Sequence, residues 1–118
     1  MNEGNVTVLE RAIEAWGRRD LEAYLKLYDA DVVLHGLEPG LGAVREMYAH
    51  VWQAYPRSGL QLDDVISEGD KLACRYTWRA TDTSTGEAFV VPGVTIMHFR
   101  DGKVRERWDF EGTERNVA

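Results

Sequence analysis

The main change in the hydrophobic pattern of the chain occurs at Pro56. Before it, apolar residues recur at every third or fourth position, which is typical of amphipathic helices. After it, apolar and polar residues alternate, which is typical of strands with one buried face. Helices followed by a run of antiparallel strands predict a single α+β domain, in which the helices cover one face of a curved sheet.

Three helices are predicted. Thr7 and Glu10 have the spacing of a capping box, and they would begin the first helix, which ends near Gly17. Asp20 is a favoured N-cap residue for the second. Its apolar stripe contains Leu21, Tyr24, Leu25 and Tyr28. The third helix ends before Pro56, and its apolar face contains Val44, Met47, Tyr48, Val51, Trp52 and Tyr55.

The strands follow from the alternating segments. DVVLHG predicts a first strand between the second and third helices, and the remaining strands follow Pro56. In the segment KLACRYTWRAT, one face contains Leu72, Cys74, Tyr76 and Trp78. The alternation slips at Asp63–Asp64, which predicts a bulge. Asp101–Gly102 predicts a two-residue hairpin turn. If that hairpin is regular, His98 shares a face with Asp109, whereas a bulge would reverse this.

Composition narrows the possible functions. The net charge is -6 and the chain contains no cluster of Lys and Arg residues, which disfavours nucleic-acid binding. A single cysteine cannot form an internal disulfide. No segment reaches the roughly 20 apolar residues of a membrane span, and the N-terminal segment does not resemble a secretory signal. We therefore expect a cytoplasmic domain with no membrane partner.

The segment VRERWDFEG contains the main candidate for chemistry, Asp109. If this carboxylate faces an apolar cavity, lost hydration suits it to proton transfer. If it pairs with Arg107, two residues away on the same face, the group would be inert. Trp108 and Phe110 would lie on the opposite, outer face of the sheet. Exposed aromatic residues there predict a homodimer through that face.

Four segments together resemble the nuclear-transport-factor-2-like superfamily, and above all its SnoaL-like polyketide cyclases. They are AIEAWGRRDLEAYLKLYDADVVLHG, LGAVREMYAHVWQAYP, ISEGDKLACRYTWRATDTSTGE and FRDGKVRERWDF. The resemblance implies a cone-shaped, cystatin-like α+β fold. Three N-terminal helices would pack on a strongly curved sheet, mixed but mostly antiparallel, with an apolar pocket inside.

The resemblance also implies roles for particular residues. Asp109 matches the last-strand aspartate that acts as the acid/base in ring closure, and His35 matches a histidine that often ends the first strand. Tyr76 could polarise a ligand carbonyl or simply pack in the core. The residues expected to contact a ligand are Trp16, Met47, Val51, Tyr76, Trp78 and Val94.

The sequence alone leaves three functions open. The leading hypothesis is a cyclase or isomerase without a cofactor or metal, acting on a small apolar molecule that carries a carbonyl. The second is a non-catalytic domain for ligand binding or dimerisation. The third is a hydrolase or dehydratase that uses a pocket water. By resemblance to limonene-type epoxide hydrolases, Tyr76 and Trp78 match the positions of their Arg and second Asp. By resemblance to ketosteroid isomerases, Gly36 matches the position of their base, so neither mechanism carries over intact.

Overall fold

The computed structural model describes residues 2–112 and 115–116. The described chain forms three helices, α1 (Asn2–Gly17), α2 (Leu21–Leu25) and α3 (Leu41–Ala54). Its strands are β1 (Tyr28–Leu34), β2 (Gly59–Glu68), β3 (Lys71–Thr81), β4 (Ala88–Arg100), β5 (Lys103–Glu111) and β6 (Arg115–Asn116).

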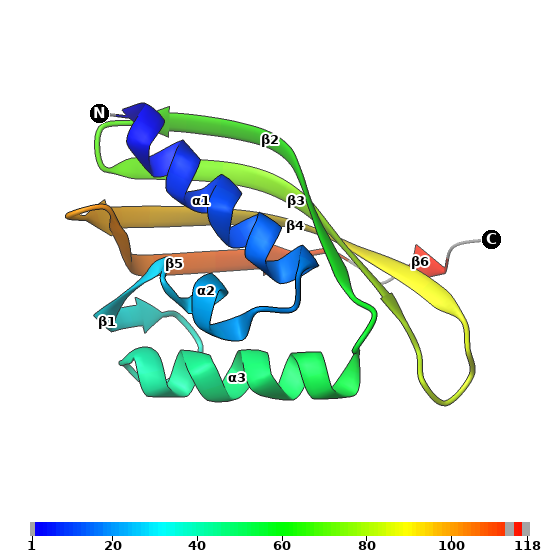
Figure 1. Cartoon of the computed structure of the whole chain (residues 1–118). Coiled ribbons are helices and arrows are strands. Elements are labelled where there is room, and N and C mark those ends of the chain that lie inside the picture. Colours follow the sequence, from blue (N-terminus) through cyan, green and yellow to red (C-terminus); the bar gives the residue numbers. More distant parts are fainter. Residues whose placement is uncertain (1, 113–114, 117–118) are drawn as a thin grey trace.

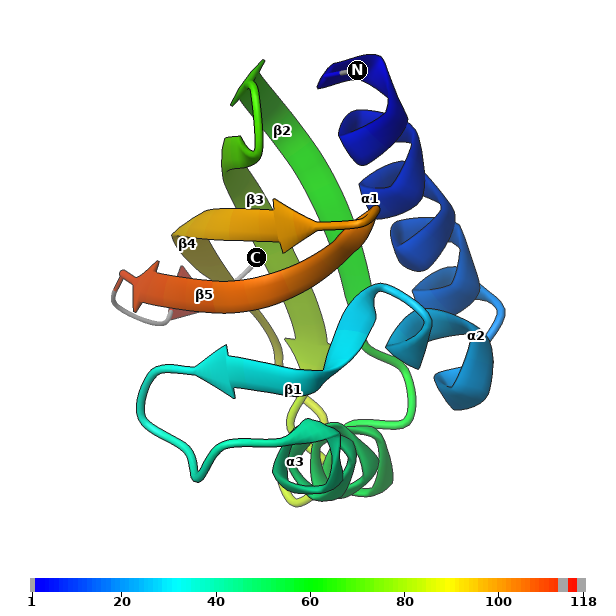
Figure 2. The same cartoon turned by 90° about the vertical axis from the view of Figure 1, so that its left-hand side faces the viewer.

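The strands form one curved sheet in the order β1-β5-β4-β3-β2, and β6 pairs with β4. β1 runs parallel to β5, and the other neighbouring pairs are antiparallel. Figures 1 and 2 show the sheet bending around the helices, with α1 across β2 and α3 beside β1. The predicted α+β fold, three helices on a strongly curved and mostly antiparallel sheet, is confirmed.

Two predicted helix boundaries are wrong. α1 begins at Asn2, so Thr7 and Glu10 lie inside the helix and do not cap it. α2 begins as predicted, with the Asp20 carboxylate accepting a hydrogen bond from Ala23 N at 3.0 Å, but it ends at Leu25. Tyr28 belongs to β1 because the chain pairs there with β5, next to a hydrogen bond from Val104 N to Leu27 O.

Irregular pairing decides which residues of the last two strands face the helices. The predicted bulge occurs in β2 between Leu62 and Asp64. Asp101 and Gly102 form the predicted turn, both with positive φ. The β4–β5 register nevertheless shifts beside His98, so this residue pairs with Glu106 on the outer face. Beyond the shift, Arg107 and Asp109 point towards the helices.

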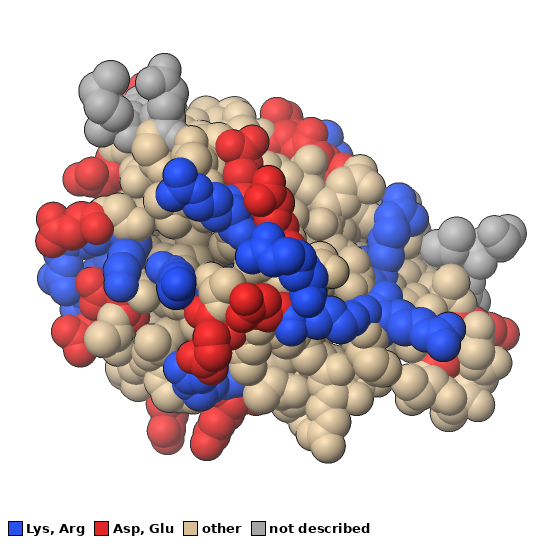
Figure 3. All heavy atoms as spheres, in the orientation of Figure 1, with Lys and Arg blue, Asp and Glu red and all other residues tan. Residues whose placement is uncertain are grey.

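The main core lies between the helices and the concave face of the sheet. Three of its aromatic members, Trp16, Tyr24 and Tyr48, come from α1, α2 and α3, and they pack edge to face with ring centroids 4.8–5.6 Å apart. On the surface, Figure 3 shows acidic and basic side chains interspersed over the helical side. No described helix is long and apolar enough to span a membrane.

Candidate functional site

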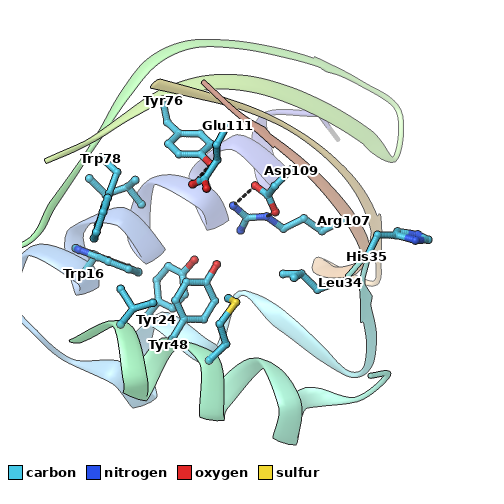
Figure 4. Close-up of a pocket in the computed structure, with 13 residues that line it drawn as sticks. Trp16, Tyr24, Leu34, His35, Tyr48, Tyr76, Trp78, Arg107, Asp109 and Glu111 are labelled. Atoms are coloured by element: carbon cyan, nitrogen blue, oxygen red, sulfur yellow. Dashed lines mark hydrogen bonds and ion pairs between the residues drawn. The ribbon is translucent and has the colours of Figure 1, made fainter. Parts of the chain in front are cut away.

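A cavity of about 300 Å³ opens between the helices and the concave face of the sheet. This volume is at the lower end of small-molecule sites. Figure 4 shows its polar side chains facing one another across the space. The lining residues are Trp16, Tyr24, Leu34, His35, Met47, Tyr48, Val51, Leu60, Tyr76, Trp78, Arg107, Asp109 and Glu111.

Asp109 both faces the cavity and pairs with Arg107. The guanidinium donates from Nε and Nη2 to the two carboxylate oxygens, each at 2.9 Å. Arg107 is 7% exposed, whereas the Asp109 side chain is 25% exposed. The sequence offered two alternatives for Asp109, a group that faces the pocket or a member of an ion pair. In the structure this carboxylate is both. Bidentate hydrogen bonding by the guanidinium fixes the orientation of the Asp109 carboxylate.

Tyr28 connects this ion pair to the floor of the cavity. Its hydroxyl oxygen accepts a hydrogen bond from Arg107 Nη1 at 2.5 Å. The same oxygen lies 3.1 Å from the hydroxyl of Tyr24 and 3.2 Å from that of Tyr48. Burial, the largest cause, raises the pKa of Tyr24 and of Tyr28 well above the ordinary value for tyrosine. These hydroxyls consequently remain neutral at physiological pH.

Tyr76 lies on the sheet side of the cavity, as the alternation in β3 predicts. Its hydroxyl donates to Glu111 Oε2 at 3.3 Å. Burial, followed by the nearby charges of Asp109 and Glu111, raises the pKa of Tyr76. Since its proton already has an acceptor, Tyr76 is poorly placed to polarise a ligand carbonyl.

Most of the residues expected to contact a ligand line the cavity. Trp16, Met47, Val51 and Trp78 all line it. Val94 does not: it is 43% exposed and lies on the outer face of β4, so this expectation is wrong. The reason is strand alternation, since its neighbours Gly93 and Thr95 are the buried positions.

His35 lies at the rim of the cavity, but its ring points away from Asp109 (Figure 4). The imidazole is stacked on Trp108 with ring centroids 4.7 Å apart, and its Nε2 lies 2.7 Å from Glu106 Oε2. Both partners are on the outer face of β5. The structure thus does not bring the predicted proton-transfer partner of Asp109 to it.

Cys74 is not suited to nucleophilic chemistry. Burial raises the pKa of Cys74 to about 11, so the thiol stays protonated near neutral pH. Among the described residues there is no group of three or more His, Cys, Asp or Glu side chains that could hold a metal ion.

The hydrophobic pattern of the sequence does not predict the polar half of the site. Tyr24, Tyr28 and Tyr48 were assigned only to apolar helix stripes, and Arg107 only to a pairing that would inactivate Asp109. A tyrosine on a helix stripe gives no signal that separates a packed ring from a hydroxyl directed at a cavity. Glu111, by contrast, shares the alternation of Arg107 and Asp109, and that signal was available.

Comparison with known proteins agrees with this architecture. The family model of the SnoaL-like domain matches residues 9–107. None of the proteins of curated function matches the chain in sequence.

Three solved structures illustrate the likeness in fold. AclR of Streptomyces galilaeus, assigned provisionally as a hydroxylase, is 24% identical with a TM-score of 0.84, covering 95% of this chain and 91% of its own. An NTF2-like protein of unknown function from Burkholderia pseudomallei is 23% identical with a TM-score of 0.81, covering 92% and 91%. A SnoaL-like polyketide cyclase from Agrobacterium tumefaciens is 16% identical with a TM-score of 0.83, covering 92% and 91%.

Proposed function

Because the chain belongs to the SnoaL-like domain family, we propose that it is an acid/base enzyme that works without a cofactor. It acts as a cyclase or isomerase on a small, largely apolar molecule that carries a carbonyl. The observation that carries this proposal is the carboxylate of Asp109, which Arg107 fixes in place and which still faces the cavity.

The proposed step is proton transfer next to the ligand carbonyl. A carboxylate oxygen has two lone pairs, and the contact with Arg107 occupies one on each oxygen of Asp109. A remaining lone pair takes the proton from the carbon, and the electrons of the C–H bond move to form an enolate. In an isomerisation Asp109 returns the proton to another carbon. In a cyclisation the enolate carbon attacks a second carbonyl carbon of the same ligand and forms a C–C bond. The π electrons of that carbonyl move to its oxygen, and Asp109 returns the proton to the resulting alkoxide.

A purely ligand-binding domain is the second candidate. It is favoured by the same ion pair, since a carboxylate that already has two donors needs no further partner from a ligand or from chemistry. The two candidates differ in one measurable respect. The enzyme exchanges hydrogens next to a ligand carbonyl with solvent, whereas the binding domain holds the ligand unchanged.

Hydrogen–deuterium exchange at the methyl group of acetophenone, followed by NMR, tests the proposal. We expect the wild-type protein to accelerate exchange above the buffer rate. Asp109→Asn should reduce that acceleration by roughly 100- to 10,000-fold while leaving acetophenone affinity nearly unchanged. Glu111→Gln removes the other carboxylate of the cavity and is the matched control, which should retain exchange. Binding without exchange in the wild-type protein would leave the binding domain as the function.

We also propose that two copies pair through the outer face of the sheet. One cross-strand row on this face contains Ile66, Ala73, Ile96 and Trp108. Beside it, Val94 pairs with Phe110, which is 63% exposed. A contiguous apolar surface of this kind is typical of an interface between protein chains.

A further inference from the structure

The hydrogen bonds of Tyr28 leave a hydroxyl proton available to a ligand. The Tyr28 oxygen accepts from Arg107 Nη1, so it has one further lone pair and one proton to share with Tyr24 and Tyr48. It can therefore accept from one of these tyrosines and must donate to the other. The tyrosine that accepts this hydrogen bond from Tyr28 does not donate its own hydroxyl proton to Tyr28.

That proton has two acceptors within reach, the hydroxyl oxygen of the other cavity tyrosine and a ligand oxygen in the cavity. Tyr24 and Tyr48 both line the cavity, and Figure 4 shows their hydroxyl oxygens directed into it. Tyr28 itself is 1% exposed and does not line it. Trp16 packs edge to face against both rings, which holds the two hydroxyls side by side at the floor.

The buried charge of Arg107 strengthens this donor. A hydroxyl that accepts from a cation becomes a better donor to its next neighbour, and the effect increases where water is excluded. The guanidinium contacts Tyr28 directly, and Tyr28 contacts the two cavity tyrosines. The ligand site thus receives a polarised O–H group while the cation stays paired with Asp109.

We propose that one hydroxyl of the Tyr24–Tyr48 pair, the one that accepts from Tyr28, donates to the carbonyl oxygen of the ligand, and that Tyr28 is a positioning residue that couples this pair to Arg107. This inference rests on the proposed function and deepens it. The ligand class is a ketone or aldehyde with one hydrogen-bond-accepting oxygen at its buried end and apolar groups towards Trp16, Trp78 and Met47. The carbon next to the carbonyl then lies on the side of Asp109.

The same anchor contributes to the reaction. When the proton leaves, negative charge develops on the carbonyl oxygen, and a preorganised donor stabilises that charge more than it stabilises the neutral ketone. Asp109 and the tyrosine pair come from opposite sides of the cavity, the sheet and the helices. The two groups can therefore act on the same ligand, one on the C–H bond and the other on the oxygen.

The infrared carbonyl stretch of acetophenone, labelled isotopically at the carbonyl carbon and bound to the full chain, tests the anchor. We expect a frequency lower than in cyclohexane, because hydrogen bonding weakens the C=O bond. The double variant Tyr24→Phe/Tyr48→Phe should raise the frequency towards the cyclohexane value and weaken binding by roughly three- to tenfold. Tyr28→Phe should raise the frequency part of the way, although Tyr28 does not contact the ligand.

Tyr55→Phe is the control, since it removes a tyrosine hydroxyl that does not line the cavity and should leave the frequency unchanged. An unchanged frequency in the double variant, or loss of the shift only in Tyr76→Phe, would overturn the proposal. So would failure of acetophenone to bind. The two proposals can fail separately. A lowered carbonyl frequency without hydrogen exchange supports the tyrosine anchor but not catalysis by Asp109. Hydrogen exchange without a lowered frequency supports catalysis by Asp109 but not the anchor.

Discussion

The ring of Tyr76 lies directly over Gly93, its partner across β3 and β4. A Cβ atom at Gly93 would stand 2.3 Å from Cζ of this ring. The absence of a side chain at Gly93 is therefore what allows Tyr76 to occupy the sheet side of the cavity. β4 runs without a break through Pro92 and Gly93, and Gly93 is a point of close approach within this strand.

Gly93→Ala should displace the Tyr76 ring and destabilise the protein by about 1–3 kcal/mol, the usual effect of overpacking. Chemical denaturation measures the change. Gly42→Ala is the matched control because nothing lies within 4 Å of its added methyl group, and α3 contains this residue. Equal effects at the two glycines would contradict the contact. Combining Gly93→Ala with Tyr76→Ala should recover most of the loss caused by the methyl group.

Arg107→Met should destabilise the protein by about 3–5 kcal/mol, because it leaves Asp109 and Tyr28 without their buried donor. Since Asp109 is partly exposed, the lower part of this range is expected. Adding Asp109→Leu should recover part of the loss, because a buried carboxylate without a partner is the main penalty. Denaturant unfolding of the single and double variants measures the free energy of unfolding. A double variant less stable than Arg107→Met would contradict the expected recovery.

Asp63 should make folding stability depend on acid pH. A hydrogen bond from Thr77 Oγ1 at 2.6 Å, the largest cause, lowers the pKa of this carboxyl, with a second from Gln61. A lowered folded-state pKa contributes stability above the unfolded value of about 3.9, and that stability is lost as the pH falls through the folded value. The stability difference between wild type and Asp63→Asn should therefore shrink from neutral pH to about pH 3. Asp64→Asn, on the same strand, is the control.

Cys74 should be nearly inert in the folded protein. With a pKa of about 11, roughly one thiol in a thousand is ionised at pH 8, and the side chain is 5% exposed. A disulfide reagent that reports released thiolate by absorbance should react slowly with native protein and promptly after denaturation. Rapid reaction of the native protein would show that β3 opens to solvent.

Ile96→Glu should separate the proposed homodimer, because it places a charge in the middle of the apolar row on the outer face. Analytical ultracentrifugation over a range of protein concentrations measures the oligomeric state. His50→Glu, at an exposed position of α3, is the control for an added charge elsewhere and should leave the dimer intact. A wild-type protein that remains monomeric at high concentration would overturn this interface.

The sequence by itself determined the elements and the faces of the regular strands. The helical period before Pro56 and the alternation after it are local consequences of backbone geometry, so the α+β class and the inward positions of β3 could be predicted. Asp109 could be named because it matches the last-strand aspartate of the SnoaL-like cyclases, and the alternation correctly places Arg107 on the same face. The ends of the helices were harder to predict, since Tyr28 continues the helical pattern of the sequence but pairs with β5 in the structure.

Only the tertiary structure decided the chemistry around Asp109. The β4–β5 register shift placed His98 outside, and contacts with Glu106 and Trp108 turned the His35 ring away. The cluster of Tyr24, Tyr28 and Tyr48 joins α2, β1 and α3 to Arg107 on β5. Hydrogen bonds depend on where side chains from distant segments meet, and a local periodicity contains no information about that meeting point.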